Sequence, residues 1–383
     1  MDKLYNRLLT PSPGSFFLFG ARGVGKSTWV RQVFPEAERI DLLQERLFHQ
    51  FVADPGLLGD VVRRLAPGST IVVDEVQRVP ALLNEVHRAI EEGRYRFVLL
   101  GSSARRLKSA GTNLLAGRAV RRTLAPLLPA ELGTDFDLEA VLEHGSVPLV
   151  WASPDRRAAL EAYVEMYLRE EIRAEALVRN LPGFVRFLPV AALLHGQAIN
   201  VSGVARDAGV SRTTVAGYLE ILEDTLLAFR LPAFEARLRV RERSHPKFYF
   251  VDSGIVRAAK RQLGPVGAEE RGALFEGWVL GVLRAHNDLQ PLYDDVAYWA
   301  PAGAARTEVD FLLRRGQRFI ALEAKATTRY SSEVLSGLRA ISGLAGLERR
   351  ILVYRGSQAL RTEEGIDVWP VRTLLDAIEG GTL

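Results

Sequence analysis

The chain of 383 residues contains no cysteine, and that absence excludes disulfide bonds and thiolate metal sites. Long apolar runs are also missing, because no stretch approaches the roughly eighteen apolar residues that a membrane-spanning helix needs. The N-terminal stretch MDKLYNRLLTPSPG lacks the apolar core of a signal peptide. The six histidines are scattered and form no metal-ligand pattern. We therefore expect a cytoplasmic protein that does not bind membranes.

Lysine is scarce, with six lysines against 44 arginines, and the formal net charge is only +4. Any nucleic-acid-binding surface must therefore be local rather than spread over the whole chain. Arginine suits bidentate phosphate contacts. The same bias is typical of a GC-rich or heat-adapted source, so the composition leaves both interpretations open. Two of the few lysines, Lys26 and Lys325, lie in sequence motifs.

A phosphate-binding loop is the strongest motif. Residues 16–27 read FFLFGARGVGKS, an apolar strand followed by a full match to G-x-x-x-x-G-K-[ST] and then by a helical pattern. In such a loop backbone N–H groups surround the phosphates, Lys26 reaches the β/γ oxygens, and Ser27 ligates Mg²⁺. The predicted nucleotide-binding residues are Gly20, Ala21, Arg22, Gly23, Val24, Gly25, Lys26, Ser27 and Thr28.

Two further strands end in polar residues that suit ATP hydrolysis. In TIVVDEVQ, residues 70–77, Asp74 can hold Mg²⁺ through water and Glu75 can orient the attacking water. In RFVLLGSS, residues 96–103, Ser102 is placed to sense the γ-phosphate. These strands alternate with helical segments, so the sequence predicts an α/β domain with a parallel sheet.

The order of these motifs, followed by Gly117-Arg118 before RRTLAPL, resembles the AAA-type prokaryotic ATPases that carry a C-terminal nuclease-like domain of unknown function. The resemblance implies that Arg118 acts as a finger on the γ-phosphate of a neighbouring subunit, and hence that the protein is a homo-oligomer. Four other arginines compete for this role: Arg105, Arg106, Arg121 and Arg122.

The middle of the chain predicts a helical lid followed by a helix-turn-helix. Residues 199–224, INVSGVARDAGVSRTTVAGYLEILED, place Ser202 and Ser211 at helix starts and Gly209 in the turn. The second helix would present Tyr218 outward together with the predicted DNA contacts Arg212, Thr213 and Thr214. Winged helices also bind proteins, so a protein partner stays open.

An alternating arginine stretch follows. In EARLRVRERS an extended strand would present four guanidiniums on one face, namely Arg237, Arg239, Arg241 and Arg243. Such a row repels itself unless an anion bridges it, which favours a nucleic-acid backbone, whereas a solvated edge strand is the alternative.

The C-terminal part contains a possible nuclease centre. TEVDFLL and RFIALEAKAT, residues 307–313 and 318–327, form a hairpin if Gly316-Gln317 is a two-residue turn. Asp310 then lies opposite Glu323, with Lys325 on the same face. This arrangement resembles the PD-(D/E)xK nucleases, although Val309 replaces the literal proline.

The nuclease resemblance implies that Asp310 and Glu323 bind Mg²⁺ or Mn²⁺, and that Lys325 positions water or stabilises charge. In that family a glutamate lies on the preceding helix, where Glu276 shares a face with apolar residues of segment 271–286 and could complete the metal site. An ordinary salt-bridge network is the alternative for all three acids.

These features predict an α/β protein in four parts: an AAA+-like P-loop ATPase core (1–127), a helical lid (128–195), a winged helix-turn-helix (196–245) and a restriction-endonuclease-like domain (246–383). The favoured function is an ATP-hydrolysing, DNA-binding protein with a metal-dependent nuclease domain. The alternative is a signalling ATPase whose winged helix and inactive nuclease fold bind protein partners.

Overall fold

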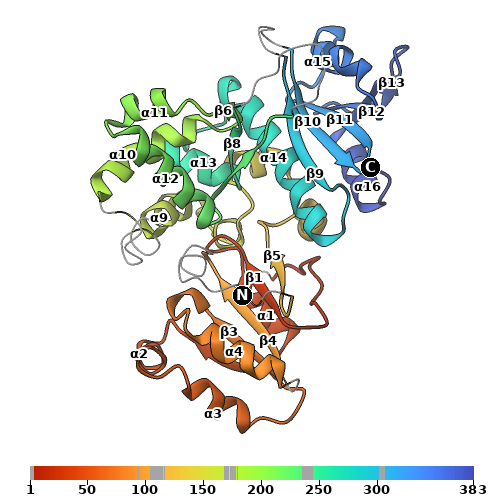
Figure 1. Cartoon of the computed structure of the whole chain (residues 1–383). Helices are drawn as coiled ribbons and strands as arrows, with labels where there is room; N and C mark the ends of the chain where they lie inside the picture. Colours follow the sequence, from red (N-terminus) through yellow and green to blue (C-terminus); the bar gives the residue numbers. More distant parts are fainter. Residues whose placement is uncertain are drawn as a thin grey trace.

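The computed structural model describes residues 4–92, 95–103, 117–167, 180–234, 245–301 and 307–383, and the single residues 115, 172 and 178. The predicted arginine stretch Arg237–Arg243 lies outside the described residues, so its DNA-binding role stays a prediction. The described residues form three sheets, and Figure 1 shows the first at the bottom of the molecule and the other two above it.

The N-terminal sheet is parallel, with the strand order β2-β3-β4-β1-β5, and it confirms the predicted α/β architecture. Its central strands are apolar on both faces because helices cover both sides. The strands are β1 Phe16–Phe19, β2 Glu38–Asp41, β3 Thr70–Asp74, β4 Arg96–Gly101 and β5 Val120–Thr123. The helices are α1 Lys26–Val33, α2 Glu45–Ala53, α3 Leu57–Arg63 and α4 Leu82–Glu91.

The middle of the chain is helical, as predicted. Its helices are α6 Pro129–Leu132, α7 Leu138–His144, α8 Pro148–Trp151, α9 Arg156–Tyr167 and α10 Leu181–Leu193. Short 3₁₀ helices span Val76–Arg78, Gly133–Asp135, Ser332–Leu335 and Ile341–Gly343.

A helix-turn-helix follows, made of α11 (Val201–Ala208) and α12 (Arg212–Asp224). Gly209 takes the left-handed conformation that the turn needs (φ 64°), and Ser211 caps α12 as predicted. The prediction for Ser202 is wrong, because the Asn200 side chain accepts the capping bond from the Gly203 amide.

Tyr218 does not face outward as the helical pattern suggested. Its side chain is 5% exposed, and its hydroxyl donates to the Asn180 carbonyl oxygen at 2.9 Å. The ring packs on Phe184 and Phe187 of α10, which supply the apolar partner that the isolated sequence of α12 does not reveal.

A small antiparallel sheet accompanies the helix-turn-helix, in the order β6-β8-β7. Its strands are β6 Gln197–Ala198, β7 Ala228–Leu231 and β8 Lys247–Phe250. The predicted domain limits assign β8 to the C-terminal part, whereas the structure pairs β8 with β6 and β7. Helix α13 (Ser253–Lys260) continues from β8 and packs against α7, α9 and α10.

The C-terminal sheet is mixed, in the order β13-β14-β12-β11-β10-β9. The strands are β9 Asp295–Trp299, β10 Val309–Arg315, β11 Arg318–Lys325, β12 Leu347–Tyr354, β13 Leu360–Arg361 and β14 Asp367–Pro370. The helices are α14 Ala268–Leu289, α15 Ser336–Ala340 and α16 Val371–Glu379. The 22-residue α14 runs between this sheet and the rest of the molecule (Figure 1).

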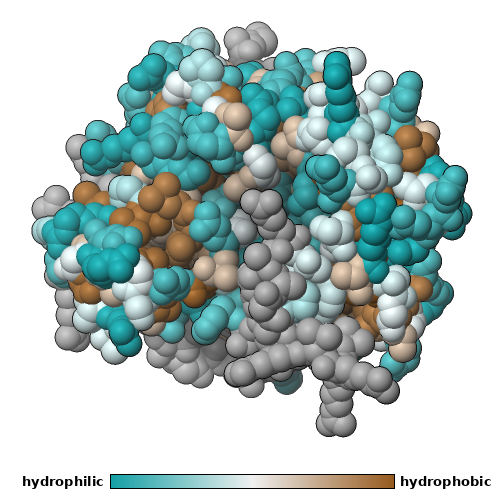
Figure 2. All heavy atoms as spheres, turned by 90° about the horizontal axis from the view of Figure 1, so that it is seen from above, coloured by the Kyte–Doolittle hydropathy of each residue, from teal (hydrophilic) through white to brown (hydrophobic). Residues whose placement is uncertain are grey.

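Hydrophilic side chains cover most of the face shown in Figure 2, and hydrophobic surface gathers on its left side, over the helices drawn at the left of Figure 1. Within the part of the chain that the structure describes, no helix is both long and apolar enough to cross a membrane.

Candidate functional sites

The phosphate loop connects β1 to α1, as its sequence predicted. A Cβ atom on Gly20 would lie 2.5 Å from the Leu124 carbonyl oxygen, so only glycine allows the loop to leave the sheet this close to its neighbour. Gly25 adopts φ 88° at the N-cap of α1 and has no side chain to occupy the first amides of the helix. Those amides are therefore left to an anion.

The three residues predicted to hold Mg²⁺–ATP lie together. The largely buried Lys26 ammonium donates to the Gly20 carbonyl oxygen at 2.7 Å, and the Ser27 hydroxyl donates to Asp74 Oδ2 at 2.6 Å. Burial raises the pKa of Asp74, and the Ser27 hydrogen bond opposes that rise. The donor set fits the group, since Lys26 can turn to phosphate oxygens while Ser27 and Asp74 offer oxygen ligands to Mg²⁺.

A polar cluster lies beside Ser27 and Asp74. Ser102 Oγ donates to Glu75 Oε2 at 3.2 Å, and the Gln77 amide donates to both Ser102 and Glu75. Gln77 is fully buried, and its Oε1 has no hydrogen-bond partner among the described residues. No sequence motif singled out Gln77, which follows the buried Val76 shortly after the Asp74-Glu75 pair. The cluster fixes the Glu75 carboxylate beside the phosphate loop.

The nucleotide cleft has a volume of about 540 Å³, and the helical segment forms one of its walls. Leu149 is half exposed at the mouth, where its backbone N–H donates to the Gly23 carbonyl oxygen at 3.3 Å. The Tyr163 hydroxyl of α9 donates to the Arg22 carbonyl oxygen at 2.9 Å. Arg7 donates to the carbonyl oxygens of Val24 and Ala125, which ties the phosphate loop to the segment after β5. The contacts of Leu149 and Tyr163 place the helical segment against the phosphate loop, and its role as a lid stays a prediction.

Arg118 lies away from this cleft. It precedes β5, which runs parallel to β1, so Arg118 is at the edge of the sheet opposite the phosphate loop. Its guanidinium forms an ion pair with Glu91 and lowers the pKa of that carboxyl. The arginine therefore does not reach the nucleotide cleft of its own chain. Its action on a neighbouring subunit stays a prediction.

The predicted DNA contacts lie at the start of α12. Arg212 and Thr213 are exposed, and Thr214 is half-buried. The Ser211 hydroxyl lies within hydrogen-bond distance of the hydroxyls of Thr213 and Thr214, at 2.8 and 2.7 Å. The exposed N-terminal turn suits a phosphate or a base edge.

The hairpin of β10 and β11 has the predicted alignment. The paired positions run from Phe311 opposite Leu322 to Arg315 opposite Arg318, with Gly316 at φ 60° in the turn. The next position brings Asp310 to Glu323, where the Asp310 amide donates to Glu323 Oε2 at 3.3 Å. Lys325 pairs with Glu323 and lies 3.8 Å from Asp310 Oδ2. The three side chains converge on one face, as the alternation along the strands predicts.

A second lysine, which the sequence analysis missed, enters the same cluster from β8. Lys247 Nζ lies 3.0 Å from Glu276 Oε1, 3.1 Å from Glu308 Oε1 and 3.7 Å from Asp310 Oδ1. Burial disfavours its ammonium, but the three carboxylates outweigh burial and raise the pKa of Lys247. Lysine is scarce in this chain, and Lys247 begins the otherwise aromatic strand KFYF. Its unusual place is the sequence feature that could have indicated a buried ion pair.

The cluster is strongly perturbed electrostatically. Burial, and then repulsion from Asp310, raises the pKa of Glu276 to about 7 and that of Glu323 well above its usual range. The Tyr249 hydroxyl donates to Glu276. Asp310 is fully buried, and its Oδ1 accepts no hydrogen bond from the described residues.

The metal site predicted at Glu276, Asp310 and Glu323 is not preformed. The described residues contain no group of three or more histidine or acidic side chains arranged to hold a metal ion. The physical reason is that Lys247 and Lys325 already occupy the positions between these carboxylates. As arranged here, the cluster is an ionic network.

Comparison with known families divides the chain into three matched segments. Residues 12–133 match the AAA domain, residues 135–265 match a domain of unknown function (DUF8612), and residues 271–374 match another domain of unknown function (DUF4143). The first match agrees with the phosphate loop and supports an ATPase. The other two name no activity.

Two relatives from bacteria are described as uncharacterized proteins. A protein of Mycobacterium tuberculosis is 26% identical, over 94% of this chain and 80% of its own length. A protein of Haemophilus influenzae is 22% identical, over 79% of this chain and 80% of its own length.

Likeness to solved structures is weak. The ORC1 protein of Aeropyrum pernix in complex with DNA gives a TM-score of 0.27 at 16% identity, over 66% of this chain and 87% of that one. A signal transduction ATPase with numerous domains from Pyrococcus horikoshii gives 0.26 at 14% identity, over 72% and 45%. These scores support no inference about function.

Proposed function

We propose that this AAA-domain ATPase is a nucleotide-driven switch that acts on DNA, in which ATP turnover changes the position of the helix-turn-helix. The observation that carries the proposal is a single helix, α9, whose two tyrosines bond to the phosphate loop at one point and to the end of α12 at another. The exposed start of α12 supplies the DNA-binding surface.

The nucleotide end of this switch depends on residues of the chain itself. Lys26 would neutralise the β/γ-phosphates, and Ser27 and Asp74 would hold Mg²⁺, which supplies charge neutralisation at the transferred phosphate. Glu75 is held by Ser102 and Gln77 and is available to orient water. A change in phosphate occupancy alters the loop that carries the Arg22 carbonyl oxygen, which is the oxygen that Tyr163 contacts.

Helix α9 also contacts the helix-turn-helix, which is the DNA-binding part of the proposed switch. Tyr167, four residues after Tyr163, lies one turn further along α9 on the same face. Its buried hydroxyl is 2.9 Å from the Thr225 hydroxyl, and Thr225 is the C-cap of α12. A shift of α9 larger than these two hydrogen bonds tolerate would break one contact or move α12 with it.

The test of this coupling uses Tyr167→Phe, which removes one hydroxyl and keeps the ring. We expect basal ATP turnover to stay within about twofold of the original, whereas its stimulation by double-stranded DNA falls several-fold, as the loss of a coupling of roughly 1 kcal/mol requires. Tyr95→Phe, in the loop before β4, is a matched control that leaves stimulation unchanged. Full DNA stimulation in Tyr167→Phe would contradict the α9 link.

The acid cluster is assigned a structural role in this proposal, because two lysines occupy it. A second candidate function is metal-dependent DNA cleavage, and it is favoured by the convergence of Asp310, Glu323 and Lys325 and by the unbonded Asp310 oxygen. Linear, nicked and single-stranded DNA with Mn²⁺ or Mg²⁺, with and without ATP, separates the two. Cleavage that disappears in Asp310→Ala and persists in Glu75→Gln would establish the nuclease.

A further inference from the structure

A cavity of about 470 Å³ is distinct from the acid cluster and adjoins the nucleotide cleft, with which it shares Leu127 in its lining. Its walls come from β5 and the loop that follows it, from β7 and β8, and from one side of α14, so it lies where three segments of the chain meet. This volume is in the range of small-molecule sites. The cavity also borders Gly20 and Ala21, so an occupant would touch the start of the phosphate loop.

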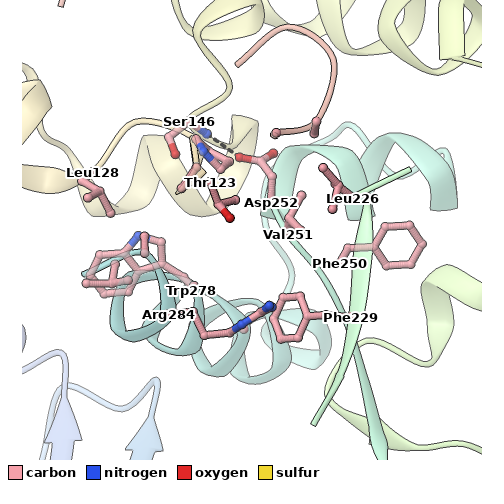
Figure 3. A pocket seen from close by; sticks show the side chains of 18 of the residues that line it. Thr123, Leu128, Ser146, Leu226, Phe229, Phe250, Val251, Asp252, Trp278 and Arg284 are labelled. Atoms are coloured by element: carbon pink, nitrogen blue, oxygen red, sulfur yellow. Dashed lines mark hydrogen bonds between the residues drawn. The ribbon is translucent and has the colours of Figure 1, made fainter. Parts of the chain in front are cut away.

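One end of the cavity carries the guanidinium of Arg284. Arg284 of α14 points toward Phe229 of β7 (Figure 3), and its Cζ lies 3.5 Å from the ring centroid. No hydrogen bond or ion pair joins Arg284 to the residues that the structure describes, and burial lowers the pKa of its guanidinium. A half-buried planar cation stacked on an aromatic ring is a natural partner for a carboxylate or a phosphate.

The charges around Arg284 leave room for an anion. Arg121 also lines the cavity and disfavours the Arg284 charge, whereas Tyr293 and Asp288, which lies four residues further along α14, favour it. The Asp288 carboxylate is hydrogen-bonded to Thr123. Three guanidiniums, those of Arg284, Arg121 and Arg122, therefore share the one carboxylate of Asp288.

The carboxylate at the far end is already satisfied. Asp252 accepts the Ser146 amide at 2.7 Å, drawn as the dashed line in Figure 3, and the Ile255 amide at 3.1 Å at the start of α13. Burial raises the pKa of Asp252 to about 6, and the backbone amides oppose that rise. Asp252 is thus a structural cap, and it does not compete for Arg284.

The remaining wall is apolar and partly open. Trp278 and Leu128 lie at one side and Val251 and Phe250 at the other, as Figure 3 shows. Gly281 of α14 lines the cavity, and a Cβ atom there would meet no heavy atom within 4 Å. A helix interior gains stability from a side chain at such a position, so an open glycine keeps space that packing alone would fill.

From these features we infer that the cavity is a binding site for a small organic anion, with an aromatic or branched apolar body against Trp278 and Phe250 and one anionic headgroup on Arg284. This site is independent of the proposed switch function. Any such ligand combines a carboxylate or phosphate headgroup with an apolar body that fits a volume of about 470 Å³.

The test uses a pair of fluorescent probes, the anion anilinonaphthalenesulfonate and its uncharged analogue phenylnaphthylamine, titrated into the full chain. Arg284→Met keeps an apolar stem and removes the charge. We expect it to weaken sulfonate binding by about tenfold or more, the loss typical of a charge-assisted hydrogen bond, and to leave the uncharged probe within about twofold. Arg372→Met, at a guanidinium 85% exposed on α16, should change neither affinity.

A second variant keeps the test decisive if Arg284→Met folds poorly. Gly281→Phe fills the cavity without changing any charge, so both probes should lose this site while the melting temperature is unchanged or higher. Equal sulfonate affinity in the original and in Arg284→Met, or undiminished probe binding in Gly281→Phe, would overturn the assignment. So would displacement of the probe by ADP with Mg²⁺, because it would place the probe in the nucleotide cleft.

Discussion

The phosphate loop and the acid cluster both bring lysine close to carboxylates, but they differ in what neutralises the lysine. Lys26 donates to carbonyl oxygens of its own loop. Lys247 is instead held by three carboxylates, those of Glu276 on α14, Glu308 just before β10 and Asp310 on β10. Moving the Lys26 ammonium from a carbonyl oxygen to a phosphate costs little free energy, because the ammonium exchanges a neutral dipole for an anion. A buried ion pair cannot open without leaving charges unpaired. The loop is therefore open to a ligand, and the cluster is closed.

The largest effect that distinguishes the two regions concerns catalysis. Glu75→Gln spares the phosphate contacts and removes the carboxylate that would orient water, so ATP turnover should fall at least about a hundredfold with nucleotide affinity kept. Lys26→Ala should instead lose affinity. Phosphate release and binding of a fluorescent ATP analogue measure the two quantities. Equal turnover in Glu75→Gln and the original chain would contradict the assignment of Glu75.

The second effect concerns the free energy of unfolding and depends on the acid cluster. Lys247→Met removes the ammonium and leaves buried carboxylates without a cation, so the free energy of unfolding should fall by about 3–5 kcal/mol. Lys325→Met, at a side chain 35% exposed, is the matched control and should cost less because water reaches it. Urea denaturation followed by circular dichroism compares them. A larger loss in Lys325→Met would show that Lys247 is not the main neutralising group.

A pH effect of smaller size follows from Glu276. Its pKa is about 7 in the folded chain and near the ordinary carboxyl value when unfolded, so the folded state binds the extra proton between these limits. This contribution to the free energy of unfolding is fully present below about pH 4.5 and is lost as the pH rises through 7. At 1.36 kcal/mol per unit of pKa difference, the loss amounts to up to about 3 kcal/mol. The free energy of unfolding of Glu276→Gln, measured over the same range, should lack this fall. An identical fall in the variant would assign the proton to another group.

The smallest effect concerns the DNA surface. Arg212→Gln should lower the slope of log affinity against log salt by about one unit if this side chain contacts a phosphate, because each contact releases about one counterion. Fluorescence anisotropy on a short duplex at several salt concentrations measures the slope. Arg372→Gln is the surface control. An unchanged slope in Arg212→Gln would place the phosphate contacts outside the start of α12.

Local patterns predicted a large part of the molecule. The glycines and Lys26 of the phosphate loop act through backbone geometry that a few consecutive residues define, and the β10–β11 hairpin follows from strand alternation and one turn glycine. The failures came where a partner is distant in sequence. Tyr218 was expected at the surface because the apolar partners on α10 are more than thirty positions away.

The sequence by itself determined the phosphate loop, the polar strand ends of a parallel sheet, the helix-turn-helix and the opposition of Asp310 to Glu323, because each depends on neighbours along the chain or across a two-residue turn. Only the tertiary structure decided which groups neutralise the acid cluster. Lys247 comes from another sheet, more than sixty positions before Asp310, and the 3.7 Å between them depends on how β8, α14 and β10 pack. Electrostatic energy depends on distance in space, and the sequence alone does not give that distance.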